Sequence, residues 1–211
     1  MKIKICGMKY ADNIRDVSAL QPDFMGFIFY PASSRFVGYD FNETIVKAVP
    51  DSIRKVGVFV NESVENVIAI AARFEFHLVQ LHGNESPQYC QQLKHNGLSI
   101  IKAISIDATI DFSTLLAYQP WCSYFLFDTK TNGFGGSGQS FDWGILDSYK
   151  LPVPFFLSGG LGTENIDAAM NIKHPMLYGL DMNSKLESLP GMKEIGATNN
   201  IITKARNHER I

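Results

Sequence analysis

Short apolar segments recur at regular intervals along the chain. Eight segments are rich in β-branched and aromatic residues, and a polar or glycine-containing break follows each of them. Their ends fall at residues 6, 29, 60, 82, 105, 128, 158 and 181, so that 22 to 31 residues separate successive ends. One strand and one helix fill each interval. The spacing therefore predicts an α/β protein, a compact single-domain (β/α)₈ (TIM) barrel over residues 1–211.

Several of the expected strands are almost continuously apolar, as in Val56–Val60. This pattern is typical of parallel strands that are covered on both faces. A doubly wound open sheet would show the same alternation of strands and helices, and it is the structural alternative. The eight strands are expected at Lys2–Cys6, Phe24–Phe29, Lys55–Val60, His77–His82, Ser99–Ser105, Tyr124–Asp128, Phe155–Ser158 and Leu177–Met182.

Capping residues and glycines mark several of the intervening helices. Ser63 is a suitable N-cap for a helix over Val64–Phe74, because its hydroxyl can accept a hydrogen bond from a free backbone amide. Ser86 and Pro87 predict the start of the next helix, which Gly97 ends. Further helices are expected from Thr163 to Asn171 and over Met192–Arg206.

Composition excludes several classes of function. The chain has 211 residues, 45% of them hydrophobic and 19% charged, which is ordinary for one globular domain. A net charge of −2 offers no basic field for nucleic acid. No apolar run approaches the roughly 20 residues of a membrane span, and the first residues do not resemble a signal peptide. The three cysteines cannot all pair, so we expect free thiols and a cytoplasmic location. We expect the protein to be either a monomer or a homodimer.

Two side chains at strand ends are candidates for acid–base chemistry. Cys6 ends the first strand and Asp128 ends the very apolar sixth strand, and strand ends of this kind face the active site of a barrel. A thiol base needs a lowered pKa or a charged partner, whereas burial raises a carboxyl pKa and suits an acid. The alternatives are a buried structural thiol for Cys6 and, for Asp128, a helix cap or a partner for Lys130.

Two loops at the same end of the predicted barrel favour a phosphorylated small-molecule ligand. Gly159 and Gly160 follow the seventh strand, and the stretch Asp181–Ser184 ends the eighth. The loops after these two strands often bind phosphate in barrels, because backbone N–H groups can approach the anion closely there. Each glycine pair alone is an ordinary turn signal, so the inference depends on the two loops together.

Other segments at this end of the predicted barrel have either a functional or a structural interpretation. Arg35, after the second strand, can bind a carboxylate through two hydrogen bonds or simply be solvated. His82, at the end of the fourth strand, is expected to shape the pocket. The glycine-rich run Gly133–Gly138 is either a mobile lid or a surface loop. The sequence contains no metal-ligand spacing and no dinucleotide fingerprint, which predicts no metal and no cofactor.

Taken in order along the chain, these segments resemble the phosphoribosylanthranilate isomerase family. The resemblance extends from residue 3 to the final helix, and each motif follows the appropriate strand. The matching segments are Ile5-Cys6-Gly7-Met8, Ser34-Arg35-Phe36-Val37, Val79-Gln80-Leu81-His82-Gly83, Phe127-Asp128, Gly135-Gly136-Ser137-Gly138, Phe141-Asp142-Trp143, Leu157-Ser158-Gly159-Gly160-Leu161, Leu180-Asp181 and Glu187-Ser188-Leu189-Pro190-Gly191-Met192-Lys193.

The resemblance implies a (β/α)₈ barrel that catalyses a cofactor-free Amadori rearrangement in tryptophan biosynthesis. It implies that Cys6 is the general base, that Asp128 is the general acid and that Arg35 binds the anthranilate carboxylate. The phosphate would be held by groups around Gly159, Gly160, Asp181, Asn183 and Ser184.

One position departs from the family pattern. Lys185 stands where family members commonly have glycine, and at positive φ it would introduce strain of about 1 kcal/mol. Two alternatives to the isomerase stay open. One is another phosphate-binding barrel, such as a synthase or epimerase that acts on a phosphosugar. The other is a non-catalytic barrel that senses a phosphorylated metabolite and would not require both Cys6 and Asp128.

Overall fold

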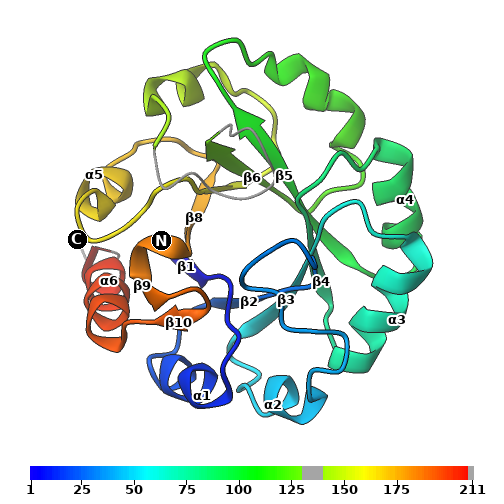
Figure 1. Ribbon diagram of the computed structural model, residues 1–211. Coiled ribbons are helices and arrows are strands. Elements are labelled where there is room, and N and C mark those ends of the chain that lie inside the picture. Colours follow the sequence, from blue (N-terminus) through cyan, green and yellow to red (C-terminus); the bar gives the residue numbers. More distant parts are fainter. Residues whose placement is uncertain (130–139, 209–211) are drawn as a thin grey trace.

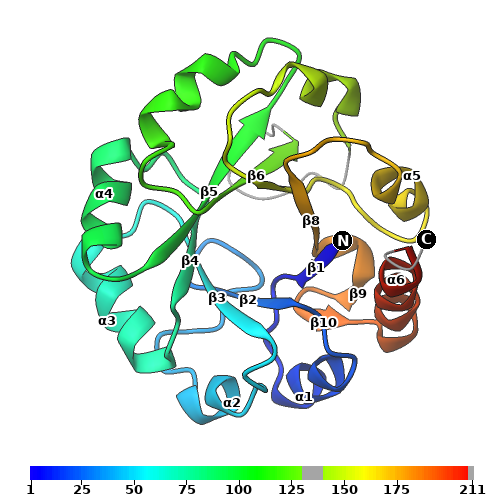
Figure 2. The same ribbon diagram turned by 180° about the vertical axis from the view of Figure 1, so that it is seen from behind.

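Eight parallel strands form a closed barrel in the order of the sequence, with helices around its outside (Figures 1 and 2). The computed structural model describes residues 1–129 and 140–208. The barrel strands are β1 (Lys2–Ile5), β2 (Phe24–Ile28), β3 (Arg54–Phe59), β4 (Leu78–Leu81), β5 (Ser99–Ile106), β6 (Tyr124–Thr129), β7 (Phe155–Leu157) and β8 (Leu177–Met182).

The first and last strands of the barrel pair with each other, and this pairing closes the sheet. Lys4 of β1 lies opposite Asp181 of β8, and Ile5 lies opposite Met182. An open, doubly wound sheet would leave these two strands unpaired. The predicted (β/α)₈ barrel is therefore confirmed, and all eight predicted strands are present to within a few residues at their ends.

The expected helix caps are also present. Ser63 Oγ accepts a hydrogen bond of 3.2 Å from the backbone amide of Asn66, and Ser86 Oγ accepts one from Tyr89. The helices are α1 (Ala11–Ala19), α2 (Glu43–Lys47), α3 (Val64–Phe74), α4 (Pro87–His95), α5 (Ile166–Met170) and α6 (Ile195–His208), and the 3₁₀ helices are η1 (Phe112–Tyr118), η2 (Trp143–Ser148) and η3 (Ser184–Leu186).

The C-terminal part of the chain differs from its prediction. The last helix begins at Ile195 rather than near Met192, because Met192 and Lys193 form β10, which pairs with β9 (Glu187–Leu189) in an antiparallel hairpin. Gly191 has φ +88°, which supplies the turn between the two short strands. Helix α5 is also shorter than expected, and η1 and η2 show that the helices after β5 and β6 are of the 3₁₀ type.

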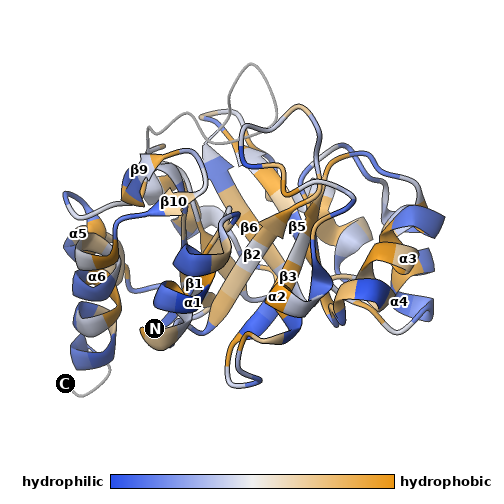
Figure 3. Ribbon diagram, turned by 60° about the horizontal axis from the view of Figure 1, so that its bottom comes forward, coloured by the Kyte–Doolittle hydropathy of each residue, from blue (hydrophilic) through white to orange (hydrophobic). Residues whose placement is uncertain are grey.

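The apolar core consists of two layers. The larger one fills the space between the strands and the outer helices, and the smaller one fills the barrel itself with residues such as Phe24, Val56 and Phe156. Figure 3 shows the hydrophobic strands at the centre and the more hydrophilic faces of the helices outside. Among residues 1–129 and 140–208, no helix has the length and apolarity to cross a bilayer.

Candidate active site

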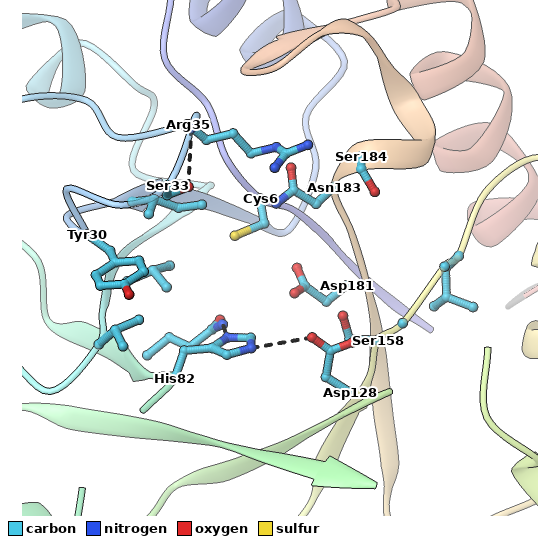
Figure 4. A pocket seen from close by; sticks show the side chains of 17 residues that line it. Cys6, Tyr30, Ser33, Arg35, His82, Asp128, Ser158, Asp181, Asn183 and Ser184 are labelled. Carbon is cyan, nitrogen blue, oxygen red and sulfur yellow. Dashed lines mark hydrogen bonds and ion pairs between the residues drawn. The ribbon is translucent and has the colours of Figure 1, made fainter. Parts of the chain in front are cut away.

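One pocket at the carboxyl ends of the barrel strands contains every site residue that the sequence predicts (Figure 4). Its apolar wall includes Ile28, Tyr30 and Val58. In the view of Figure 4, Cys6 lies on one side and Asp128 and His82 lie on the other, with Asp181 between them. The predicted residues that line the pocket are Cys6, Arg35, His82, Asp128, Gly159, Gly160, Asp181, Asn183 and Ser184.

Cys6 lies directly after β1 and is only 4% exposed. Its backbone amide donates a 2.8 Å hydrogen bond to the carbonyl of Met182 at the end of β8, which fixes the backbone at this point. Gly26 of β2 faces the thiol, and a Cβ at that position would lie 2.7 Å from Sγ. The absence of a side chain at Gly26 therefore leaves the space that the thiol occupies.

The electrostatic surroundings of Cys6 differ in part from the expectation. Burial raises the pKa of the thiol above its ordinary value, and the negative charge of Asp181 adds to this effect. The positive charges of Lys4 and Lys193 act in the opposite direction. The charged partners that a thiolate needs are thus present, but the pKa of the thiol is raised rather than lowered.

Asp128 occupies the corresponding position on β6 and is 5% exposed. Its Oδ1 accepts a 2.9 Å hydrogen bond from the amide of Thr129, and its Oδ2 lies 3.3 Å from His82 Nε2. His82 Nδ1 is in turn 2.8 Å from the side-chain amide nitrogen of Gln80. When Gln80 donates to Nδ1, the proton of the neutral imidazole resides on Nε2, directed at Asp128.

The two phosphate-loop candidates border the same pocket. Gly159 and Gly160 have φ values of +93° and +62°, which glycine adopts without strain. The backbone amides of Gly159, Gly160 and Ser184 donate to no acceptor within the described parts of the chain. These N–H groups are available to an anionic ligand, as the sequence predicts for phosphate.

Arg35 lines the pocket from the loop after β2 and already has an acidic partner. Its Nε and Nη2 donate to both carboxylate oxygens of Glu187 in the β9–β10 hairpin, with Nη2 2.6 Å from Oε2. The Arg35 side chain is 22% exposed, whereas that of Glu187 is 4% exposed. Glu187 thus holds the guanidinium beside the pocket that Arg35 lines.

Three charged residues next to the pocket were not among the predicted site residues. Lys4, Glu187 and Lys193 are buried or nearly so, and they connect β1, the β9–β10 hairpin and the pocket. The position of Lys4 could have been predicted from the sequence. Lys4 precedes Cys6 by two residues, and strand alternation places both side chains on the same face of the strand.

The structure also bears on the expectations for Lys185 and for the three cysteines. Lys185 lies in η3 and is not among the described residues with positive φ, so the predicted strain at this position is absent. All three cysteines are buried free thiols, as expected. The possible lid Gly133–Gly138 and the possible Asp128 partner Lys130 lie outside the described residues. Within those residues, no group of three or more His, Cys, Asp or Glu side chains is arranged to hold a metal ion.

Comparison with known families agrees with the resemblance seen in the sequence. The family model described as N-(5'phosphoribosyl)anthranilate (PRA) isomerase matches residues 3–204. The chain belongs to this family. Relatives named N-(5'-phosphoribosyl)anthranilate isomerase include the Parabacteroides distasonis protein, 45% identical over 96% of this chain and 92% of its own length. The Phocaeicola vulgatus protein is 41% identical over 98% of both chains.

Solved structures of phosphoribosyl anthranilate isomerases share the barrel. The Thermotoga maritima enzyme has a TM-score of 0.86 and 31% identity, with 98% of this chain and 99% of that chain covered. A second isomerase structure has a TM-score of 0.83 at 28% identity, with the same coverage. It was solved in complex with reduced 1-(o-carboxyphenylamino)-1-deoxyribulose 5-phosphate. The family members therefore include a barrel that binds a ligand with both a phosphate and an aromatic carboxylate.

Proposed function

We propose that the chain isomerises N-(5'-phosphoribosyl)anthranilate to 1-(2-carboxyphenylamino)-1-deoxyribulose 5-phosphate, a step of tryptophan biosynthesis. The observation that carries the proposal is the juxtaposition of Cys6 and Asp128 across one pocket, which the free loop amides border on one side and Arg35 on another. This arrangement matches an aldose–ketose isomerisation, which needs an acid, a base and anchors at both ends of the substrate.

The first step in this proposal is acid-catalysed ring opening. Protonated Asp128 gives its proton to the ribose ring oxygen, the bond from that oxygen to C1′ breaks, and the anthranilate nitrogen forms an iminium. His82 orients the carboxyl group through Oδ2, which lies 3.3 Å from its Nε2. Asp128 ends this step as a carboxylate.

The second step is proton removal by Cys6. The adjacent iminium acidifies the C2′ proton, the thiolate takes it, and the electron pair of the C–H bond forms an enolamine. Tautomerisation then adds a proton at C1′ and removes the proton of the C2′ hydroxyl, which leaves a ketone at C2′ and returns a proton to the Asp128 carboxylate. The hydrogen lost at C2′ is balanced by the one gained at C1′, so the substrate supplies both halves of the redox change.

The anchors are assigned by charge and geometry. The free amides of Gly159, Gly160 and Ser184 are suited to the phosphate, together with Asn183. Arg35 is suited to the anthranilate carboxylate, because a guanidinium can form two parallel hydrogen bonds with it. Ile28, Tyr30 and Val58 give the aromatic ring an apolar wall.

A turnover assay distinguishes the proposed isomerase from a non-catalytic metabolite sensor. Freshly generated phosphoribosylanthranilate is added to the purified protein without metal or nucleotide, and the loss of anthranilate-type fluorescence is followed. The isomerase is expected to consume the substrate catalytically. Phosphate-dependent binding without turnover would overturn the proposal and favour the sensor.

We also propose a cytoplasmic location and a monomer or homodimer. A solved structure of the T. maritima isomerase describes that protein as dimeric and as the source of monomers, so both states occur with this fold. Sedimentation of the purified chain would distinguish them, and a larger assembly would contradict the proposal.

A further inference from the structure

Three lysines are buried within the described parts of the chain, and the partners of two of them explain their burial. Lys102 Nζ donates to the carbonyls of Leu81, Gly83 and Ala103 and to Glu85 Oε2, at 2.7 to 3.3 Å. Lys193 Nζ donates to Asn183 O, Asn183 Oδ1 and Glu187 Oε1, at 2.6 to 3.2 Å. The three N–H groups of each ammonium therefore have acceptors.

Lys4 is different. It is 0% exposed, and Asp181, whose Oδ1 lies 2.8 Å from Nζ, is its one acidic partner among residues 1–129 and 140–208. Its other side-chain hydrogen bond is with the thiol of Cys6. Unlike Lys102 and Lys193, Lys4 therefore has the candidate base as one of its partners.

The group that can accept from Lys4 lies two residues further along the same strand. Lys4 and Cys6 share the inner face of the barrel, and the ion pair of Lys4 with Asp181 borders the pocket that Cys6 lines. The other charges that act on the thiol are Asp181 from β8 and Lys193 from β10. Lys193 is paired with Glu187, whereas Lys4 shares a side-chain hydrogen bond with Cys6 itself.

We propose that Lys4 is a positioning residue that stabilises and orients the thiolate of Cys6. After the thiol has released its proton to solvent, an N–H group of Lys4 donates to Sγ, while the ammonium itself stays protonated throughout. This inference rests on the proposed role of Cys6 as the general base. It assigns a function to a buried lysine that neither the acid nor the anchors of the substrate require.

The charges at the site support this assignment. Burial disfavours the charged form of Lys4, but Asp181 and Cys6 together outweigh burial and raise its pKa above the ordinary value. In return, Lys4 is the largest of the influences that lower the pKa of the thiol. A neutral side chain at position 4 would leave burial and Asp181 to act on Cys6 with less opposition.

The test measures the thiol directly in Lys4→Met, a variant of similar length without the charge. Iodoacetamide labelling of Cys6 is followed against pH by peptide-resolved mass spectrometry, which separates Cys6 from Cys90 and Cys122. The thiol pKa is expected to rise by at least one unit, so that labelling near neutral pH slows about tenfold or more. An unchanged labelling profile would overturn the proposal.

Two further variants separate charge from damage to the fold. Lys102→Met removes a similarly buried ammonium, and it is expected to leave the labelling profile of Cys6 unchanged. Lys4→Met combined with Asp181→Asn avoids an unpaired buried carboxylate, and its thiol pKa is expected to exceed that of Asp181→Asn alone. An equal shift in Lys102→Met, or none in the double variant relative to Asp181→Asn, would contradict the proposal.

Labelling does not depend on turnover, so the two proposals fail separately. If Cys6→Ser retained near wild-type turnover, the base role of Cys6 would be wrong. The labelling shift in Lys4→Met would still report whether Lys4 stabilises the thiolate.

Discussion

At the scale of single residues, the proposed chemistry depends on a thiol whose burial opposes its ionisation. Because burial raises the pKa of Cys6 above its ordinary value, only a small fraction is thiolate near neutral pH. A base acts only when deprotonated, and the alkylation rate of Cys6 reports its thiolate fraction. This rate is expected to rise with pH, about tenfold per unit at most, until the raised pKa is passed. An alkylation rate of Cys6 that is constant between about pH 6 and 9 would contradict this prediction.

Arg35 is expected to affect substrate binding more than the chemical step. Arg35→Gln removes the charge that we propose binds the anthranilate carboxylate, while Glu187 keeps its contact with Lys193. Hydrogen bonds to charged groups contribute about 1.5–3 kcal/mol, so KM is expected to increase roughly 10- to 150-fold with a smaller change in kcat. Steady-state kinetics tests this, with Arg73→Gln as the control.

Arg73 is a suitable control because it pairs with Glu43 in an exposed position outside the pocket. Its replacement is expected to leave KM within about twofold, since exposed ion pairs contribute little. Equal increases in KM for both variants would show that the effect at Arg35 is not specific to the site.

At the scale of secondary-structure elements, the β9–β10 hairpin connects the stability of the fold to the site. Glu187 accepts hydrogen bonds from Arg35, from Lys193 and from the Gly191 amide. Glu187→Ala leaves the buried Lys193 without its acidic partner and is expected to lower the free energy of unfolding by about 3–5 kcal/mol. Denaturant titration measures this loss, and Glu187→Gln, which retains an acceptor oxygen, is expected to lose less.

The loss is expected to depend on pH in one direction. Burial alone would raise the pKa of Glu187, but Arg35 and Lys193 outweigh burial and hold it below the ordinary value. A depressed carboxyl pKa stabilises the fold above the unfolded-state pKa, and this contribution disappears as the pH falls through the folded-state value. The difference between wild type and Glu187→Ala should therefore shrink in acid. A constant difference would contradict the assignment.

The same elements show what the sequence could and could not predict. Strand ends were predictable, because apolar runs and the breaks after them mark where Cys6 and Asp128 enter the pocket. The β9–β10 hairpin was not predicted, since strands of three and two residues are too short to show a period. The partners of Lys4 and Lys193 depend on contacts between residues far apart in the chain, which no local pattern contains.

At the scale of the whole molecule, pairing of β1 with β8 joins the first barrel strand to the last. Helix α6 also contacts α1, α5 and β1, so the C-terminal helix completes the outer layer beside the N-terminal elements. We therefore predict a single domain over residues 1–211 that unfolds in one cooperative transition. Tryptophan fluorescence and far-UV circular dichroism should give the same denaturation midpoint. Two separate transitions would indicate two units.

In the mechanism we propose, Cys6 and Asp128 act as the base and the acid of one isomerisation. The most direct test compares the turnover of phosphoribosylanthranilate by wild type, Cys6→Ser and Asp128→Asn, with binding of the reduced product analogue measured in parallel. Both variants are expected to lose about 10²- to 10⁴-fold in kcat while they still bind the analogue. Near wild-type turnover by either variant would contradict the account.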